Sequence, residues 1–402
     1  MRRFSFFFFA IIICLISNTG EPCTTAIISG KITPDGRPLL WKNRDTDNLN
    51  NKLMYFREGN LDYIGIVNSN DSNGNEIWIG MNNAGFAIMN SVAANLGLYD
   101  TVKYKDKEGI IMKLALRECT TVDDFEKLLN TLNKPLGVET NFGVIDAYGN
   151  AAYFETHHWG YVKFDVNESP DGYLIRTNFA FSGVEDKGQG YERYLIEEEL
   201  FKDAYNKGNL TLQFILQDAA RCLKHGLTKV DLKKQCSFNP DDDIFVNFAD
   251  FIPRYSTSAS VVIQGVRKGD NSDKMIMWTI LGFPPCSVVY PVFFNEEKLL
   301  PSILSAESGN NAWLCSKVLE VKDKCFPIKR GRGTNYIKIN VLYNLSGSGI
   351  MQRLMILENE ILRNSEEFIN DYFKTGLSID LLKKYYNSND EKIINYFNNL
   401  LK

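Results

Sequence analysis

The stretch CTTAIISGKITPDGRPLLWKNRDTD, residues 23–47, decides the fold that we predict for this chain. Two apolar runs, 24–29 and 38–42, flank residues 33–36, where TPDG is a strong turn signal. This pattern predicts a β-hairpin. Because Cys23 comes directly before the first run, we expect its thiol at the start of the first strand of a sheet.

An apparent export signal precedes Cys23. Residues 1–22 begin with a charged start that contains two arginines, followed by an apolar run over 6–16 and a short polar stretch. A transmembrane helix needs about 20 apolar residues, so this run is too short for a stable span. We therefore expect residues 1–22 to be a signal peptide plus a short propeptide that ends in Glu21 and Pro22. Their removal makes Cys23 the N-terminal residue of an exported protein.

An N-terminal cysteine combines two chemical groups that catalysis needs. A free α-amine ordinarily has a pKa of about 7.7 to 8.0, so a useful fraction is an unprotonated base near neutral pH. The thiol beside it ordinarily has a pKa of about 8.5 and is a strong nucleophile when ionised. Cys23 would thus carry a nucleophile and its base in one residue.

A disulfide bond is the alternative role for Cys23, because exported proteins commonly pair their cysteines. The chain has eight cysteines, and an odd number remains once Cys14 leaves with the signal. At least one thiol of a monomer therefore stays unpaired. Cys315 and Cys325 are close enough in sequence to close a disulfide loop, but spacing alone leaves the connectivity open.

Composition excludes several classes of function. Hydrophobic residues make up 44% and charged residues 23% of the 402 residues, as in a globular protein. A net charge of −4 gives no basic footprint for nucleic acid. The three histidines offer little for a Ser-His-Asp site, and no C-x-x-C or His-x-x-x-His spacing suggests zinc. We therefore expect no nucleic-acid partner and no metal site.

Further along the chain, strands and helices follow one another without regular βαβ alternation, which favours a layered α+β fold. The predicted strands are 77–81, 86–89, 142–146, 151–155, 173–176, 259–264, 275–281 and 287–294. The predicted helices are 107–118, 121–132, 191–205, 210–223 and a helical tail over 351–401. We predict one large domain over 23–300, with a mostly helical segment, 301–402, packed on it.

The segment from Cys23-Thr24-Thr25 to Arg44-Asp45-Thr46-Asp47 resembles the N-terminal-nucleophile cysteine hydrolases. It is similar to the choloylglycine hydrolase and penicillin V acylase families, and more closely to the acyl-CoA:6-aminopenicillanic acid acyltransferases. Those families begin the mature chain with Cys-Thr and carry Arg-x-x-Asp after the first hairpin, which Arg44 and Asp47 match here. The resemblance implies a four-layer αββα sandwich, here with a helical C-terminal extension.

Arg44 and Asp47 suit the chemistry of a thiol nucleophile. A guanidinium near the thiol stabilises the thiolate and keeps its charge at any relevant pH, a role that fits Arg44. A carboxylate within hydrogen-bond reach can orient the α-amine, a role that fits Asp47. The alternative for both residues is an ion pair on the surface of a charged turn.

Acyl transfer also needs hydrogen-bond donors aimed at the oxyanion of the tetrahedral intermediate. The resemblance implies Asn90 and Asn178 as these donors, with Asn82 as a rival to Asn90; turn capping is the alternative for each. It further implies that Arg193 supports the active site. An ion pair with Glu197, four residues later on the same predicted helix, is the other interpretation of Arg193.

Together these features predict an exported hydrolase of linear amide bonds that works through an acyl-thioester on Cys23. Its partner is a small acyl-amide substrate, and the chemistry requires no metal or organic cofactor. We expect a periplasmic, secreted or lysosome-like location and autocatalytic maturation. Two alternatives stay open: an acyltransferase that uses the same site with an amine acceptor, and a non-catalytic exported binding protein with Cys23 in a disulfide.

Overall fold

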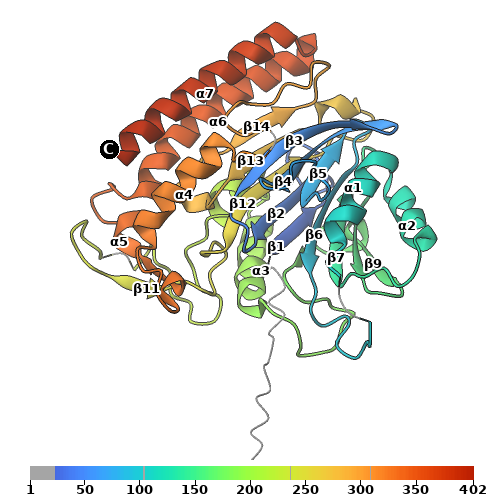
Figure 1. The fold of residues 1–402 in the computed structure, drawn as a ribbon, viewed down its shortest axis with the longest axis horizontal. Coiled ribbons are helices and arrows are strands. Elements are labelled where there is room, and N and C mark those ends of the chain that lie inside the picture. Colours follow the sequence, from blue (N-terminus) through green and yellow to red (C-terminus); the bar gives the residue numbers. More distant parts are fainter. Residues whose placement is uncertain (1–22, 103–104, 236, 308) are drawn as a thin grey trace, which may run out of the picture.

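The computed structural model describes residues 23–102, 105–235, 237–307 and 309–402 (Figure 1). The predicted signal peptide and propeptide, residues 1–22, lie outside the described residues. Two antiparallel sheets face each other at the centre of the molecule, and helices cover the outer face of each sheet.

The first sheet has six strands and contains the predicted hairpin. Its order is β10 (Tyr173–Arg176), β1 (Thr24–Ile28), β2 (Leu39–Asp45), β12 (Thr257–Gln264), β13 (Ile276–Leu281) and β14 (Tyr290–Phe293). The predicted turn is present, and β2 continues three residues beyond its predicted end at Lys42. Because β1 pairs with β10 on one side and with β2 on the other, the residue before β1 lies inside the sheet rather than at an edge.

The second sheet is a meander of seven strands in chain order. They are β3 (Asn51–Glu58), β4 (Leu61–Asn68), β5 (Ile79–Asn82), β6 (Ala87–Val92), β7 (Thr140–Ile145), β8 (Ala151–Thr156) and β9 (Tyr161–Asp165). The predicted hairpins are present as β5–β6 and β7–β8. Antiparallel meanders need only short connections between neighbouring strands, so this sheet forms from one continuous part of the chain.

Helices complete four layers. The described helices are α1 (Glu108–Glu118), α2 (Val122–Thr131), α3 (Tyr191–Asn206), α4 (Trp313–Cys325), α5 (Ile339–Leu342), α6 (Ile350–Thr375) and α7 (Ile379–Leu401). α1 packs on β4, β5 and β6, whereas α3 and α4 pack on β10 and β13. Figure 1 shows α1 and α2 on the opposite side of the two sheets from α6 and α7. The predicted αββα sandwich with a helical C-terminal part is therefore confirmed.

The predicted helix over 210–223 is present only over 212–219, and most of it is a π-helix rather than an α-helix. This segment contains a π-helical turn, η2 (Phe214–Ala219), in which the N–H of Ala220 donates to the carbonyl of Ile215 at 2.9 Å. The guanidinium of Arg221 donates to the carbonyl of Leu216 at 2.6 Å, which occupies an acceptor that a regular helix would use. In contrast, the cap predicted for α2 is present, because Thr121 and Asp124 form a capping box.

A buried ion pair ties the C-terminal helices to the segment that follows η2. Arg221 donates to the carboxylate of Glu358 in α6 at 2.8 Å, and both side chains are almost fully buried. Apolar residues of α6 and α7, such as Leu357 and Phe397, belong to the same core as Trp41 in β2. The predicted boundary after residue 300 stays a prediction. None of the described helices is both long and apolar enough to cross a bilayer.

The remaining described elements are short. They are the strand pair β11 (Phe245–Asn247) and β15 (Tyr336–Lys338), and the 3₁₀ turns η1 (Val166–Glu168), η3 (Ser272–Lys274), η4 (Pro284–Cys286) and η5 (Gly333–Asn335).

Candidate active site

Cys23 lies directly before β1 and is 4% exposed. Its Sγ lies 3.9 Å from the backbone carbonyl oxygen of Asp45, at the end of β2. The β1–β2 register pairs Thr24 with Asn43, so continuing it by one residue places Cys23 opposite Arg44. The predicted hairpin therefore returns the chain to Cys23.

Strand β2 presents its polar residues on two faces. Lys42 and Arg44 contact residues of the seven-stranded sheet and its connections, whereas the side chain of Asn43 donates to the carbonyl of Ala220, beside η2. Successive residues of a strand point to opposite faces, so Asp45 shares the face of Asn43. The polar residues near Cys23 thus form two groups, one between the sheets and one under the helices.

Arg44 belongs to the group between the sheets and is 1% exposed. Its guanidinium donates to the side-chain oxygens of Asn51 and Asn68, the latter at 2.9 Å, and lies 4.8 Å from the ring centre of Trp78. Arg44 is therefore a buried cation opposite Cys23 rather than part of a surface ion pair. This position is compatible with the role in thiolate stabilisation that the sequence suggests.

The structure does not bring Asp47 to Cys23. The Asp47 side chain is exposed, and in the described part of the chain it forms no hydrogen bond or ion pair with Cys23. Asp45 is fully buried instead, and its carboxylate accepts from Thr257 Oγ1 at 2.6 Å and from Arg254 Nε at 2.7 Å. The reason is that β2 ends at Asp45, where a register shift in β12 places Thr257 directly opposite. Asp45 is thus a buried carboxylate on the residue whose backbone carbonyl lies beside the thiol of Cys23.

Arg193, in the first turn of α3, links three of the predicted features. Its Nη1 donates to the carbonyl of Cys23 at 2.6 Å and to Thr24 Oγ1 at 2.7 Å, and its Nη2 donates to Asn178 Oδ1 at 2.7 Å. Among the described residues Arg193 forms no ion pair with Glu197. Of the two interpretations offered by the sequence, the contacts favour support of the site.

Burial sets the electrostatics around Arg193. Desolvation, followed by repulsion from Arg254, lowers the pKa of Arg193 to about 9, whereas Asp45 and Cys23 act in the opposite direction. A buried guanidinium is stabilised by nearby negative charge. Ionisation of the Cys23 thiol would add such a charge, so Arg193 and a thiolate at Cys23 favour each other.

The two asparagines predicted as oxyanion donors are both held by cations. Asn178 Oδ1 accepts from Arg193, and Asn178 Nδ2 donates to the carbonyl of Val92 at 3.0 Å. Asn90 Oδ1 accepts from the ammonium of Lys42 at 2.6 Å. Because each amide oxygen faces a cation, each NH₂ group points away from that cation. The nitrogen end of each amide is therefore its donor end, and Asn90 Nδ2 donates to Thr140 Oγ1 at 3.5 Å, just as Asn178 Nδ2 donates to Val92.

The rival asparagine, Asn82, has a structural role. Its Nδ2 donates to the carbonyls of Leu116 and Cys119 at 2.9 and 2.8 Å, at the end of α1. Its Oδ1 accepts from the backbone of the turn between β5 and β6. These contacts show that Asn82 caps the turn. Asn90, in contrast, contacts Lys42 of β2, the strand that returns the chain to Cys23.

None of the described cysteines forms a disulfide bond with another described cysteine. Cys315 Sγ lies 3.4 Å from the carbonyl of Leu49, and Cys325 Sγ lies 3.8 Å from the sulfur of Cys286. The possible Cys315–Cys325 disulfide is therefore not formed. Among the described residues, no three His, Cys, Asp or Glu side chains gather closely enough to hold a metal ion.

A cavity of about 350 Å³ opens beside the site and is lined by Arg193, Arg254 and Gly190, among others. A larger cavity of about 930 Å³ lies at the turn end of the β1–β2 hairpin, around Asp35 and Phe373, and contains none of the six predicted site residues. The smaller cavity is therefore the one whose walls include groups in contact with Cys23 and Asp45.

Glu197 gives a pH-dependent prediction. Its side chain is fully buried, and neither carboxylate oxygen has a hydrogen-bond partner among the described residues. Desolvation raises the pKa of Glu197 well above its usual value, although Arg193 opposes the shift. A raised folded-state pKa favours folding below the unfolded-state pKa of about 4.3, and this advantage is lost as the pH rises through the folded-state pKa.

Glu197→Gln is expected to increase the free energy of unfolding at pH 7 by about 1 kcal/mol and to leave it nearly unchanged at pH 4. The amide keeps the size of the side chain and removes its ionisation. Urea unfolding of both proteins across pH 4 to 8 measures the difference. Equal stabilities at pH 7 would show that the buried carboxyl carries no pH-dependent cost.

Sequence reasoning missed four residues of the site: Lys42, Asp45, Arg254 and Thr257. A signal for the first two was present, because the polar residues after Trp41 alternate in the way that a strand requires. Extending the predicted strand to Asp45 would have placed that carboxylate on the sheet. Arg254 and Thr257 are more than 200 positions away in the chain, and no local pattern joins them to Asp45.

The sequence matches a family model for acyl-coenzyme A:6-aminopenicillanic acid acyl-transferase over residues 32–207. The resemblance to this acyltransferase family is therefore confirmed. The matched range contains Arg44, Asn90, Asn178 and Arg193, but it begins after Cys23. No curated protein matches the sequence.

Several solved structures are similar to the chain. A variant of conjugated bile acid hydrolase from Clostridium perfringens is 12% identical, with a TM-score of 0.41, covering 67% of this chain and 92% of its own. An N-acylethanolamine-hydrolyzing acid amidase ortholog from Caenorhabditis elegans is 14% identical, with a TM-score of 0.40, covering 67% and 100%. Penicillin V acylase from Agrobacterium tumefaciens is 10% identical, with a TM-score of 0.35, covering 68% and 86%. The family match suggests an acyltransferase.

Proposed function

We propose that this chain is an exported hydrolase of linear amide bonds whose mature form begins at Cys23. The observation that carries the proposal is the set of contacts around Cys23. Arg193 binds the carbonyl of Cys23 and the amide oxygen of Asn178, while the thiol lies against the end of β2, where Asp45 is buried. A nucleophile, a cation and an oriented amide donor therefore lie together at the start of one strand.

In the proposed reaction, the sulfur of Cys23 attacks the carbonyl carbon of an acyl amide while the α-amine accepts the thiol proton. The amide nitrogens of Asn178 and Asn90 stabilise the oxyanion of the tetrahedral intermediate. The C–N bond then breaks, and the leaving amine takes the proton from the α-amine. Water attacks the resulting thioester, which releases a carboxylic acid and regenerates the thiol.

Asp45 takes the role that the sequence suggested for Asp47. Its carboxylate is fixed by Arg254 and Thr257, and its carbonyl lies beside the thiol of Cys23. In the proposed mechanism it orients the α-amine so that the amine reaches the thiol proton. Removal of Glu21 and Pro22 is part of the proposal, with Cys23 itself as the catalyst of the last cleavage.

An acyltransferase is the second candidate, and the description of the matching family model favours it. Hydrolysis and transfer use the same residues, because the outcome depends on whether water or an amine attacks the thioester. Incubation of the enzyme with an acyl amide and a second amine distinguishes the two. A new amide as the main product would assign a transferase, and free carboxylic acid would assign a hydrolase.

A panel of acyl amides, assayed with the native protein and with Cys23→Ser, tests the proposed function. We expect hydrolysis by the native protein and an acyl adduct on Cys23 after rapid acid quenching, detected by mass spectrometry of the intact protein. The mass should also place the N-terminus at Cys23, and the protein should appear in an exported fraction of its cells. Active protein that still carries Glu21 would contradict the proposal.

A further inference from the structure

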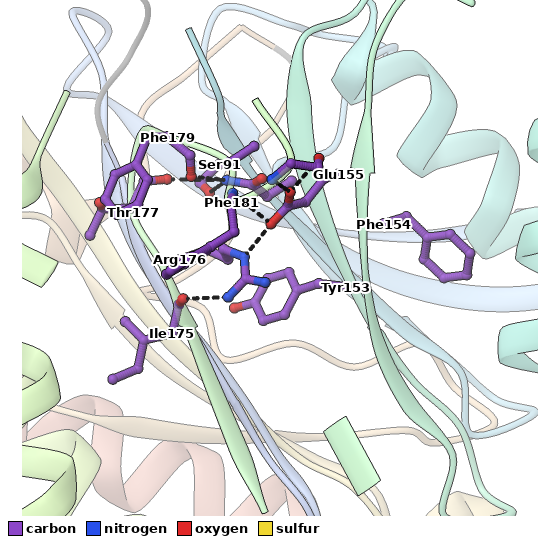
Figure 2. A network of polar contacts seen from close by, with 12 residues as sticks. Ser91, Tyr153, Phe154, Glu155, Ile175, Arg176, Thr177, Phe179 and Phe181 are labelled. Atoms are coloured by element: carbon purple, nitrogen blue, oxygen red, sulfur yellow. Dashed lines mark hydrogen bonds and ion pairs between the residues drawn. The ribbon is translucent and has the colours of Figure 1, made fainter. Parts of the chain in front are cut away.

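Glu155, in β8, is the centre of a buried polar network at one end of the sandwich. Its side chain is fully buried, and four donors converge on its carboxylate. Oε1 accepts from Arg176 Nε at 2.7 Å and from the N–H of Phe181 at 3.1 Å. Oε2 accepts from the N–H and the hydroxyl of Ser182 at 2.7 and 2.6 Å. Figure 2 shows the Arg176 side chain reaching toward the Glu155 carboxylate.

This network joins the two sheets beside the candidate site. Glu155 belongs to the seven-stranded sheet, whereas Arg176 is the last residue of β10 in the six-stranded sheet. The backbone carbonyl of Arg176 accepts from Thr25 Oγ1 at 2.9 Å, two residues after Cys23, and its guanidinium lies 5.2 Å from the ring centre of Tyr153. The ion pair therefore spans the sandwich where β1 begins.

The same network fixes the loop that carries Asn178. Glu155 holds the loop at both ends, through Arg176 before Asn178 and through the backbone after it. Asn141 holds the middle, because its Nδ2 donates to the carbonyls of Thr177 and Phe179 at 3.4 and 3.1 Å. Asn178 lies between two bound carbonyls, so the position of its side chain depends on this loop staying in place.

We propose that Glu155 is a positioning residue for the oxyanion donor Asn178, an inference that rests on the proposed function. Among the described residues, Glu155 forms no hydrogen bond with Cys23 or Asn178. It acts through the loop that carries Asn178, which it binds at Arg176 and Ser182. A neutral amide at this position offers one acceptor oxygen, whereas the carboxylate satisfies four donors with two. Glu155→Gln therefore releases one side of the loop while it preserves the volume of the side chain.

A second buried ion pair provides a matched control. Glu358 in α6 also accepts from a buried arginine, Arg221, and from a backbone N–H, that of Val289 at 2.8 Å. Both carboxylates lie in ion pairs whose side chains are at most 3% exposed. Glu358→Gln makes the same chemical change under the C-terminal helices. Each substitution leaves a buried guanidinium beside a neutral amide, so we expect both to lower Tm.

The kinetics separate positioning from stability. Glu155→Gln is expected to lower kcat by about 10- to 100-fold with little change in KM, because a displaced donor weakens the transition state more than substrate binding. Glu358→Gln is expected to keep kcat within about 2-fold of the native protein below its Tm. In an Asn178→Ala background, Glu155→Gln should cause no further loss of kcat, since its effect passes through Asn178.

Two outcomes overturn the proposal. One is equal kcat values for Glu155→Gln and Glu358→Gln. The other is that Glu155→Gln lowers kcat as much in the Asn178→Ala background as it does in the native protein. If Glu155→Gln fails to fold, Ser182→Ala removes a single hydrogen bond to the carboxylate from an exposed position and should lower kcat in the same direction.

A native protein without amide hydrolysis or transfer overturns the proposed function, and this inference falls with it. A loss of kcat in Asn178→Ala but in neither Glu155→Gln nor Ser182→Ala overturns this inference alone.

Discussion

Cys23→Ala is expected to abolish amide hydrolysis, with kcat reduced by at least about 10⁴-fold, and to accumulate with its propeptide attached. The substitution removes the sulfur that forms the thioester, and no other residue of the site replaces it. The fold should be retained, because the contacts of Arg193 with residue 23 use the backbone carbonyl rather than the thiol. Intact mass, circular dichroism and a rate assay measure the three effects.

Cys119→Ala is the control for the loss of a buried thiol. Cys119 is a free cysteine, 2% exposed, at the end of α1 on the outer face of the seven-stranded sheet. Burial raises the pKa of the Cys119 thiol to about 12, so it is not a nucleophile at neutral pH. This variant should be processed and active. Normal processing of Cys23→Ala would show that another agent removes Glu21 and Pro22.

Asp45→Asn and Asp47→Asn form the second test, and they decide between the structure and the pattern in the sequence. Asp45→Asn is expected to lower kcat/KM by about 10²- to 10³-fold, because the carboxylate that orients the α-amine toward the thiol in the proposed mechanism is lost. Asp47→Asn changes an exposed side chain two residues away and should stay within about 2-fold of the native protein.

Rates measured from pH 5 to 9 give the readout for this pair. The rise of the Asp45→Asn profile with pH should move to lower pH, because a carboxylate raises the pKa of a neighbouring amine and the amide does not. The profile of Asp47→Asn should follow the native enzyme. Thermal melting of Asp45→Asn measures how far the loss of the ion pair between Asp45 and Arg254 lowers Tm, so that an effect on stability is separated from an effect on rate. A large effect of Asp47→Asn with a small effect of Asp45→Asn would return the role to the carboxylate that the sequence suggested.

The fold was largely predictable because its information is local. Turn residues such as TPDG at 33–36, with apolar runs on either side, predict a hairpin from the local sequence alone. The segment 210–223 failed for the opposite reason. Its π-helical turn is followed by Arg221, whose guanidinium binds a carbonyl of the turn and Glu358 in a helix far along the chain. The helical spacing of apolar residues does not predict that contact.

The site was less predictable than the fold. Cys23 and Arg193 were suggested by position and pattern, and the structure brings their backbone and side chain together. The choice between Asp45 and Asp47 depended on where β2 ends, and strand ends are poorly marked in a charged sequence. Within its own stretch of chain, Arg254 donates to the carbonyl of Ala249 and to Thr257 Oγ1, and neither contact points to Asp45. Arg254 reaches Asp45 because β12, which begins three residues later at Thr257, pairs with β2.

The place of β1 inside its sheet has a consequence for the entropy of catalysis. A chain terminus ordinarily frays, and fixing the backbone of one residue costs about 1 to 2 kcal/mol. Here Thr24 and Thr25 are paired with β2, Thr25 is also paired with β10, and Arg193 clamps the carbonyl of Cys23. Folding has therefore already restrained the residue that we propose as the nucleophile, and little of that cost would remain when a substrate binds.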